Sequence, residues 1–111
     1  PAFAQEGFAT YYTKESCQKE GTSGVYTANG EVFNERILTC ARPNRKDIGK
    51  FFAVYSPLTG RQIVVRCNDL GPGKKSQAKG NIIDLTPAGF FALGWRLSAG
   101  KINVNVQQVT E

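Results

Sequence analysis

The strongest constraint on this chain is its series of short β-type segments, because a small sheet must protect every strand edge that it creates. Six segments are rich in β-branched and aromatic residues: Phe8–Tyr12, Glu35–Cys40, Lys50–Tyr55, Arg61–Cys67, Asn81–Leu85 and Ile102–Gln107. The last segment alternates apolar and polar side chains, and Pro57–Gly60 predicts a hairpin between the third and fourth. Six strands in a chain of 111 residues are expected to close into a small barrel.

One helix accompanies these strands in the sequence pattern. Thr86 is a helix-capping residue, Pro87 suits the first helical position, and Gly94 is placed to end the helix. The segment Leu70–Ser76 has the composition of a loop. Four phenylalanines in adjacent pairs are predicted to pack in the core or in a satellite cluster beside it: Phe51, Phe52, Phe90 and Phe91. The predicted fold class is therefore mainly β, with one or two short helices.

Size and composition exclude several classes of protein. The chain provides one domain, and it has no apolar run of the ~20 residues that a membrane span requires. Histidine is absent, which excludes Ser-His-Asp and Cys-His catalysis and most zinc sites. The net charge of +5 fits a polyanionic partner or simple solubility. The basic residues form no dense run, so nucleic acid is not predicted as a partner.

The first residues look like the end of a secretory signal. Ala2-Phe3-Ala4 fits the small-x-small pattern of a cleavage site, which puts Gln5 at a mature start. We therefore expect an exported protein, periplasmic, in the cell envelope or secreted. Residues 1–6 would form an N-terminal tail, and residues 7–111 a single domain.

Three cysteines are present: Cys17, Cys40 and Cys67. They form no Cys-x-x-Cys pair and no histidine can join them, so no metal site is predicted. In an exported chain one pair could form a disulfide and leave one thiol over. The alternative is three reduced, partly buried thiols.

Five collinear regions resemble those of RlpA-like proteins, a family of double-psi β-barrels in the barwin and expansin superfamily. The regions are Gly7–Tyr12, Thr27–Asn34, Thr59–Pro72, Ile83–Ala88 with Leu93-Gly94, and Gly100–Val106. Thr59–Pro72 is similar to the family's TGR-x-VVVR-x-NDRGP segment, and Ile83–Ala88 is similar to its IDLS-x-A segment. Together they cover nearly the whole chain in the family's order.

The resemblance implies a six-stranded double-psi β-barrel with a groove across one face. RlpA-like proteins act on or bind peptidoglycan, often as lytic transglycosylases, whereas barwin-type members bind chitin-like oligomers and expansins loosen wall polysaccharide. We accordingly expect peptidoglycan or a similar β-1,4-glycan as the partner, no cofactor, and a monomer.

Asp69 matches the family's catalytic acid. A single carboxyl group can protonate the glycosidic oxygen and then help the sugar's own C6 hydroxyl to close a 1,6-anhydro ring. Asp69 could equally brace the turn before Gly71 through backbone N–H groups. Arg42 stands where the family has a histidine, and a guanidinium does not transfer protons near neutral pH. Arg42 could pair with Asp69 or bind a carboxylate of a wall peptide.

Candidate substrate-binding residues lie in the matched regions: Thr10, Tyr11, Tyr12, Arg42, Asn68 and Asp84. Neighbours in a strand point to opposite faces, so only one of Tyr11 and Tyr12 can face the groove. Asp84 stands before a helix start and could be structural. Thr13 occupies the position of an aspartate in cellulase-like relatives, which disfavours a glycosidase with two carboxylates.

A disulfide between Cys40 and Cys67 is predicted, with Cys17 left over. Cys40 lies two residues before Arg42, and Cys67 lies two before Asp69. If Arg42 and Asp69 face each other on neighbouring strands, the cysteines face each other too. Barwin-like relatives also link this segment to the loop around their acidic residue. The rival pairing, Cys17–Cys40, rests on analogy with expansins.

These features predict a cell-wall protein that binds peptidoglycan or a related glycan with little or no turnover. One alternative is a lytic transglycosylase that uses Asp69 as acid and base. A second alternative is an effector or inhibitor whose groove binds a protein or peptide. Arginine at position 42 favours binding over catalysis.

Overall fold

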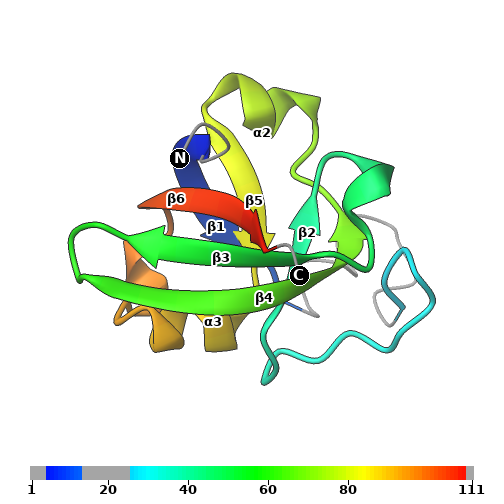
Figure 1. Cartoon of the computed structure of the whole chain (residues 1–111), viewed down its shortest axis with the longest axis horizontal. Helices are drawn as coiled ribbons and strands as arrows, with labels where there is room; N and C mark the ends of the chain where they lie inside the picture. The colour runs from blue at the N-terminus through cyan, green and yellow to red at the C-terminus, as the bar shows by residue number, and fades with distance from the viewer. Residues whose placement is uncertain (1–4, 14–25, 110–111) are drawn as a thin grey trace.

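Six strands form a closed barrel in the computed structural model, which describes residues 5–13 and 26–109 (Figure 1). The strands are β1 (Gln5–Tyr11), β2 (Thr39–Arg42), β3 (Phe51–Ser56), β4 (Arg61–Leu70), β5 (Asn81–Leu85) and β6 (Ile102–Val109). Their order around the barrel is β1-β5-β2-β4-β3-β6, and β6 pairs with β1 to close it. The predicted mainly β, six-stranded barrel is confirmed.

Short helices occupy the connections of this part of the chain. They are α2 (Lys74–Ala78), α3 (Pro87–Ala92) and the 3-10 helices η1 (Arg45–Asp47) and η2 (Leu97–Ala99). Helix α3 begins as predicted: the Thr86 hydroxyl accepts a hydrogen bond from the Gly89 N–H at 3.2 Å, and Pro87 occupies the first turn. No helix in the described ranges is long and apolar enough to cross a membrane.

Two segments differ from their predictions. β2 begins at Thr39 rather than Glu35, because Asn34 holds a turn in which its side-chain oxygen accepts from the Arg36 N–H at 2.9 Å. Residues 74–78 form helix α2 where a loop was expected, and the Gln77 side chain supports it by donating to the Pro72 carbonyl at 3.0 Å. Both differences reflect local side-chain hydrogen bonds that composition does not reveal.

The boundary of the domain was expected at Gly7. β1 begins at Gln5, and its first residue already pairs with Val106 of β6. The Ala2-Phe3-Ala4 pattern and Cys17 lie outside the described residues.

Alternate side chains of the strands fill the barrel. Fully buried members include Ala9, Cys40, Val54, Val65, Cys67, Ile83 and Leu85. Helix α3 adds the buried Phe90, and Trp95 packs against this core while its indole N–H donates to the Ser56 hydroxyl at 3.0 Å. Each large apolar side chain buried in this way contributes roughly 1.5–3 kcal/mol.

Two of the predicted core phenylalanines lie at the surface. Phe51 is 47% exposed and Phe91 is 56% exposed, whereas Phe52 and Phe90 are buried. Neighbours in a strand face opposite sides of the sheet, so Phe51 must point outward when Phe52 points inward. The prediction for Phe51 and Phe91 was wrong.

Two of the six pairings around the barrel are parallel and four are antiparallel. The β3–β4 hairpin across Pro57–Gly60 is confirmed, with Ser56 opposite Arg61. β1 runs parallel to β5, and β2 runs parallel to β4. In the β2–β4 pair the register shifts by one residue after Cys40, a β-bulge that redirects the side chains beyond it.

Candidate functional site

Four residues from four neighbouring strands lie in register on the side of the sheet that faces away from the core, and one of them, Ala41, is covered, with 2% of its surface exposed. Thr10 of β1 is opposite Asp84 of β5, Asp84 is opposite Ala41 of β2, and Ala41 is opposite Asp69 of β4. We call this set the carboxylate row. Ile83 and Leu85 fill the core on either side of Asp84, so Asp84 faces outward.

The middle of the row is made of small residues around the Asp84 carboxylate. The Thr10 hydroxyl donates to Asp84 Oδ1 at 2.5 Å. Gly71 follows β4 with φ of +143°, and a Cβ atom there would lie 3.1 Å from Asp84 Oδ2 and 3.7 Å from the Ala41 Cβ. A larger residue at position 71 would therefore displace the carboxylate.

Asp69 is held by backbone donors. Its Oδ1 accepts hydrogen bonds from the N–H of Ala28 at 3.0 Å and from the N–H of Leu70 at 2.9 Å. Among the described residues, none donates a hydrogen bond to the second carboxylate oxygen. Asp69 thus braces the turn before Gly71, as one of the two hypotheses from the sequence stated. Asp69 is also partly exposed, so its second oxygen lies at the accessible end of the row.

The Ala28 donor is positioned by a loop that Glu31 fastens to β4. The Glu31 carboxylate accepts from Arg66 Nη1 at 2.8 Å and from Asn68 Nδ2 at 3.0 Å, and the Asn29 N–H donates to the Asn68 carbonyl at 3.3 Å. The hydrogen bond with Arg66 is the main reason that the pKa of Glu31 falls to about 2. Glu31 therefore remains ionised, and it keeps the loop against Asp69.

Asn68 was predicted to contact substrate, but it is buried beneath this loop, with 1% of its surface exposed. Glu31 was not singled out as a site residue. It lies in the Thr27–Asn34 region that carries the family resemblance, and its carboxylate among neutral loop residues was the available signal.

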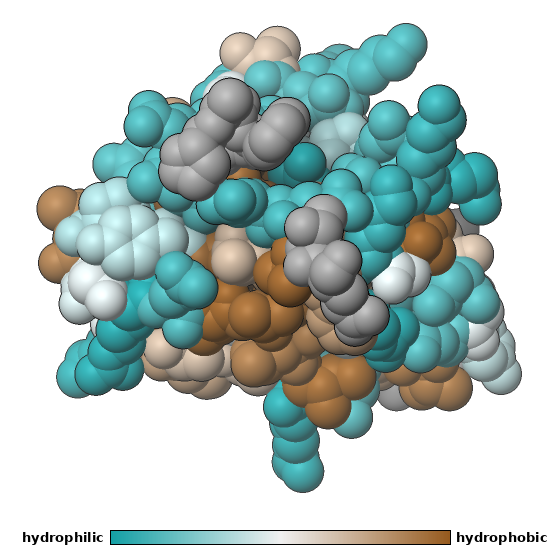
Figure 2. Space-filling model, in the orientation of Figure 1, coloured by the Kyte–Doolittle hydropathy of each residue, from teal (hydrophilic) through white to brown (hydrophobic). Residues whose placement is uncertain are grey.

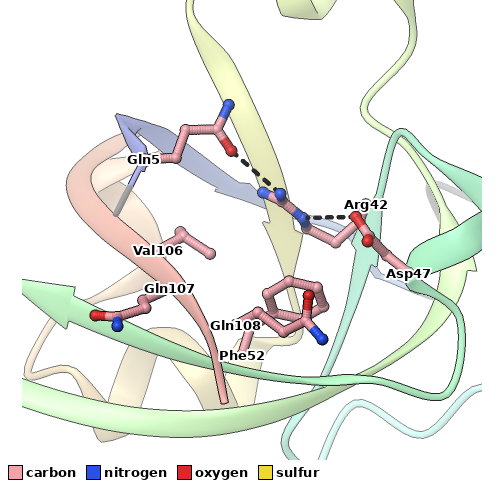
Figure 3. A pocket seen from close by; sticks show the side chains of 7 residues that line it. All are labelled: Gln5, Arg42, Asp47, Phe52, Val106, Gln107 and Gln108. Atoms are coloured by element: carbon pink, nitrogen blue, oxygen red, sulfur yellow. Dashed lines mark hydrogen bonds and ion pairs between the residues drawn. The ribbon is translucent and has the colours of Figure 1, made fainter. Parts of the chain in front are cut away.

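The side chain of Arg42 points toward Gln5 and Asp47, which are not members of the row (Figure 3). Its Nε pairs with Asp47 at 3.4 Å, its Nη2 donates to the Gln5 side chain at 3.1 Å, and its Nη1 donates to the Ile82 carbonyl at 2.8 Å. The guanidinium carbon stands 4.9 Å from the centre of the Phe52 ring. Arg42 thus pairs with Asp47 and not with Asp69, which was one of the two roles that the sequence left open. A cavity of about 430 Å³ is lined in part by Gln5, Arg42, Asp47 and Phe52.

Tyr11 and Tyr12 separate as the strand alternation predicted. Tyr11 packs against the core, with its ring edge-on to Phe90 at 5.0 Å between centroids. Tyr12 follows the end of β1, two residues after Thr10, and its ring stacks on Phe33 at 4.6 Å between centroids. Tyr12 is therefore the tyrosine on the side of the carboxylate row.

Cys40 and Cys67 are buried free thiols in the structure, and they are register partners on β2 and β4. The hydrogen bond between them lowers the pKa of Cys67 to about 7 and, with burial, raises that of Cys40 well above its usual value. They lie one step before the bulge that leads to Ala41 and Asp69. Their adjacency leaves the predicted disulfide as a proposal.

A closed six-stranded barrel in which β1–β5 and β2–β4 are parallel is the architecture of a double-psi β-barrel domain. A family model described as lytic transglycolase matches residues 4–106, and the chain belongs to this family.

Curated relatives carry the name endolytic peptidoglycan transglycosylase RlpA. The chain is 40% identical over 86 residues to the protein of Yersinia pestis and 30% identical over 107 residues to that of Pasteurella multocida. These matches cover 78% and 96% of this chain but only 21% and 32% of the relatives, so the chain corresponds to a minor part of each.

Solved structures show the same fold at low sequence identity. The Streptomyces papain inhibitor superposes with a TM-score of 0.70 at 22% identity, covering 96% of this chain and 94% of that one. An expansin of Clavibacter michiganensis superposes with a TM-score of 0.67 at 23% identity, covering 97% of this chain and 51% of the expansin.

Proposed function

We propose that this domain binds the glycan strands of peptidoglycan along the carboxylate row, with little or no turnover, in an exported protein. The observation that carries the proposal is the alignment of Thr10, Asp84, Ala41 and Asp69 across four strands. Carboxylates on an outer face accept hydrogen bonds from sugar hydroxyl and acetamido N–H groups, and these charge-assisted bonds are stronger than neutral ones. Asp84 is partly exposed, so its carboxylate is within reach of a ligand. The RlpA names of the relatives support peptidoglycan as the polymer.

The surroundings of Asp69 favour binding over catalysis. The residue opposite it on β2 is Ala41, whose methyl group transfers no proton, and the Arg42 side chain is engaged with Asp47 and Gln5. Two backbone N–H groups already donate to one oxygen of the carboxylate. This geometry suits an acceptor for a ligand better than a proton donor to a glycosidic oxygen.

Sedimentation with purified sacculi tests the proposal. Asp84→Asn removes the charge and keeps the shape, so we expect about tenfold weaker binding from the loss of one charge-assisted hydrogen bond. Glu6→Gln, an exposed carboxylate of β1 outside the row, is the matched control and should bind as the native chain does. Equal binding by the native chain and Asp84→Asn would refute the carboxylate row as the binding site.

The second candidate function is a lytic transglycosylase with Asp69 as acid and base, supported by the family model and the names of the relatives. Mass spectrometry of the soluble products from sacculi distinguishes it from binding alone. Release of 1,6-anhydro-muropeptides by the native chain, abolished in Asp69→Asn, would establish turnover. Absence of anhydro products from sacculi that the domain binds would establish a binding role.

A further inference from the structure

The outer face of β4, β3 and β6 carries a regular grid of side chains. Three registered rows cross the strands with β3 in the middle. The first row is Arg66–Phe51–Val109, the second is Val64–Ala53–Gln107, and the third is Gln62–Tyr55–Asn105. Their side chains point away from the core, because Phe52, Val54, Ile63, Val65 and Val106, which alternate with them, are buried. We call this surface the β3 face.

The centre of the β3 face is apolar and exposed. Phe51 is 47% exposed, Tyr55 38% and Val64 47%. The smaller Ala53 lies between the two aromatic residues along β3. Figure 2 shows apolar atoms gathered over β3 and β4 on this side of the molecule. Contiguous exposed apolar surface on a small soluble domain marks an interaction site more often than an accident of composition.

Amide side chains border the two rings. Gln62 lies beside Tyr55 on β4, while Asn105 and Gln107 lie on β6 beside Tyr55 and Ala53. An amide both donates and accepts hydrogen bonds, and an aromatic ring offers a flat apolar surface with a polarised face. This combination matches the hydroxyl and acetamido groups and the C–H faces of pyranose rings. Phe51 and Tyr55 are four residues apart in an extended strand, about 13 Å, the length of a short oligosaccharide.

The charges of the face exclude other occupants. Its one charged member, Arg66, is paired with Glu31 at 2.8 Å, so the β3 face offers no free cation to a phosphate backbone. A second copy of the same chain would bring together two molecules of net charge +5. A neutral, polyhydroxylated polymer fits the face better than either.

We propose that the β3 face is a second glycan-binding surface, separate from the carboxylate row, that stacks sugar rings on Phe51 and Tyr55. The inference rests on the proposed function in that the same wall polysaccharide supplies the ligand. With two surfaces on one barrel, the β3 face could hold one part of a glycan strand while the carboxylate row binds another part. Tight association with polymer and weak association with short fragments would follow, because the two sites act together.

The sedimentation assay with purified sacculi that tests the carboxylate row also tests the β3 face. The double variant Phe51→Ala with Tyr55→Ala is expected to bind about tenfold more weakly than the native chain. Phe91→Ala, which removes an exposed ring of helix α3, is the matched aromatic control and should bind normally. Tyr55→Phe keeps the ring and should retain binding. Thermal unfolding of each variant confirms the fold, since the replaced side chains lie on the surface.

Chemical shifts of backbone amides provide the second readout. On titration with a soluble peptidoglycan-derived oligosaccharide, the amides of Ala53, Val64 and Gln107 should shift in the native chain and in Asp84→Asn. Sacculus binding by the native chain that the double variant retains in full would overturn the β3 face and leave the carboxylate row intact. Failure of the native chain to sediment with sacculi would instead contradict the proposed function. A concentration-dependent dimer that the double variant abolishes would assign the face to self-association and overturn the inference.

Discussion

Ala41 and Arg42 are consecutive residues of β2, yet they belong to surfaces of opposite character. Ala41 separates two aspartates on the outside of the barrel. Arg42 lies in a mostly buried ion pair with Asp47, whose side chains are 13% and 17% exposed. The first surface gathers two like charges, whereas the second joins opposite charges beside the Phe52 ring. One step along a strand thus separates a candidate binding site from a structural cluster.

The difference teaches that a matched position does not fix a role. Arg42 occupies the place of the family's histidine in the sequence, but its guanidinium is held by partners from β1, β5 and the η1 segment. The carboxylate row depends on which residues the bulge after Cys40 turns outward. The packing of the Arg42 side chain and the exposure of the Asp84 carboxylate can therefore be altered separately.

Oxidation of the thiol pair at the bulge is expected to have the largest effect. A disulfide between Cys40 and Cys67, formed with oxidised glutathione as the oxidant, closes a loop around the 26 intervening residues and should stabilise the fold by about 3 kcal/mol. Urea unfolding of a Cys17→Ser variant, with and without reductant, measures this difference. The same variant should lose the mass of two hydrogens on oxidation. Two alkylatable thiols after oxidation and unfolding would refute the pairing.

Removal of the Arg42 side chain is expected to weaken the structural cluster and leave the row in place. Arg42→Ala deprives Asp47 of its ionic partner and the Ile82 carbonyl of a donor, which should lower the free energy of unfolding by about 2 kcal/mol. Urea denaturation checks the value, and sedimentation with sacculi checks that binding at low temperature persists. Loss of binding in a folded Arg42→Ala protein would show that the two surfaces are coupled.

A methyl group at position 71 is expected to act on the row instead. Gly71→Ala places its Cβ near Asp84 Oδ2 at a φ that disfavours side chains, so it should cost about 1 kcal/mol and weaken sacculus binding. Gly73→Ala, with no atom within 4 Å of the added group, is the control. Native binding by Gly71→Ala would argue against close approach of a ligand at Asp84.

Acidification is expected to have the smallest effect. The folded pKa of Glu31, about 2, lies below its ordinary value of 4.5, so its contribution is present above pH 4.5 and is lost as the pH falls toward 2. Glu31→Gln should flatten this part of the dependence of the unfolding free energy on pH. The group is partly exposed, so the change will be modest. A variant with the same slope as the native chain between pH 4.5 and 2 would contradict the assignment.

Local signals made most of the fold predictable. The hairpin at Pro57–Gly60, the strand Asn81–Leu85 and the start of helix α3 at Thr86 each depend on residues close together in sequence. The two outward phenylalanines were missed because an apolar residue was assigned to the core. The alternation of side chains along a strand was enough to show that Phe51 and Phe52 point to opposite sides of the sheet.

Long-range register made the site harder to predict. The sequence resemblance selected Thr10, Asp69 and Asp84, and the structure brings all three into one row. It could not place Arg42, because the partners of its guanidinium, Gln5, Asp47 and Ile82, come from other elements of the fold. Nor could it reveal that Glu31 fastens the loop carrying the Ala28 donor, since that contact joins segments distant in sequence.

The position of β1 has a consequence for how the molecule assembles. This first strand lies between β5 and β6, so both of its neighbours are made near the end of the chain. The β3–β4 hairpin can form early from local contacts, but the barrel cannot close until Ile102–Val109 is available. We therefore expect a chain emerging from a ribosome or a translocon to keep β1 unpaired until β5 has been released and the barrel open until β6 follows, and folding to be slow compared with that of the hairpin alone.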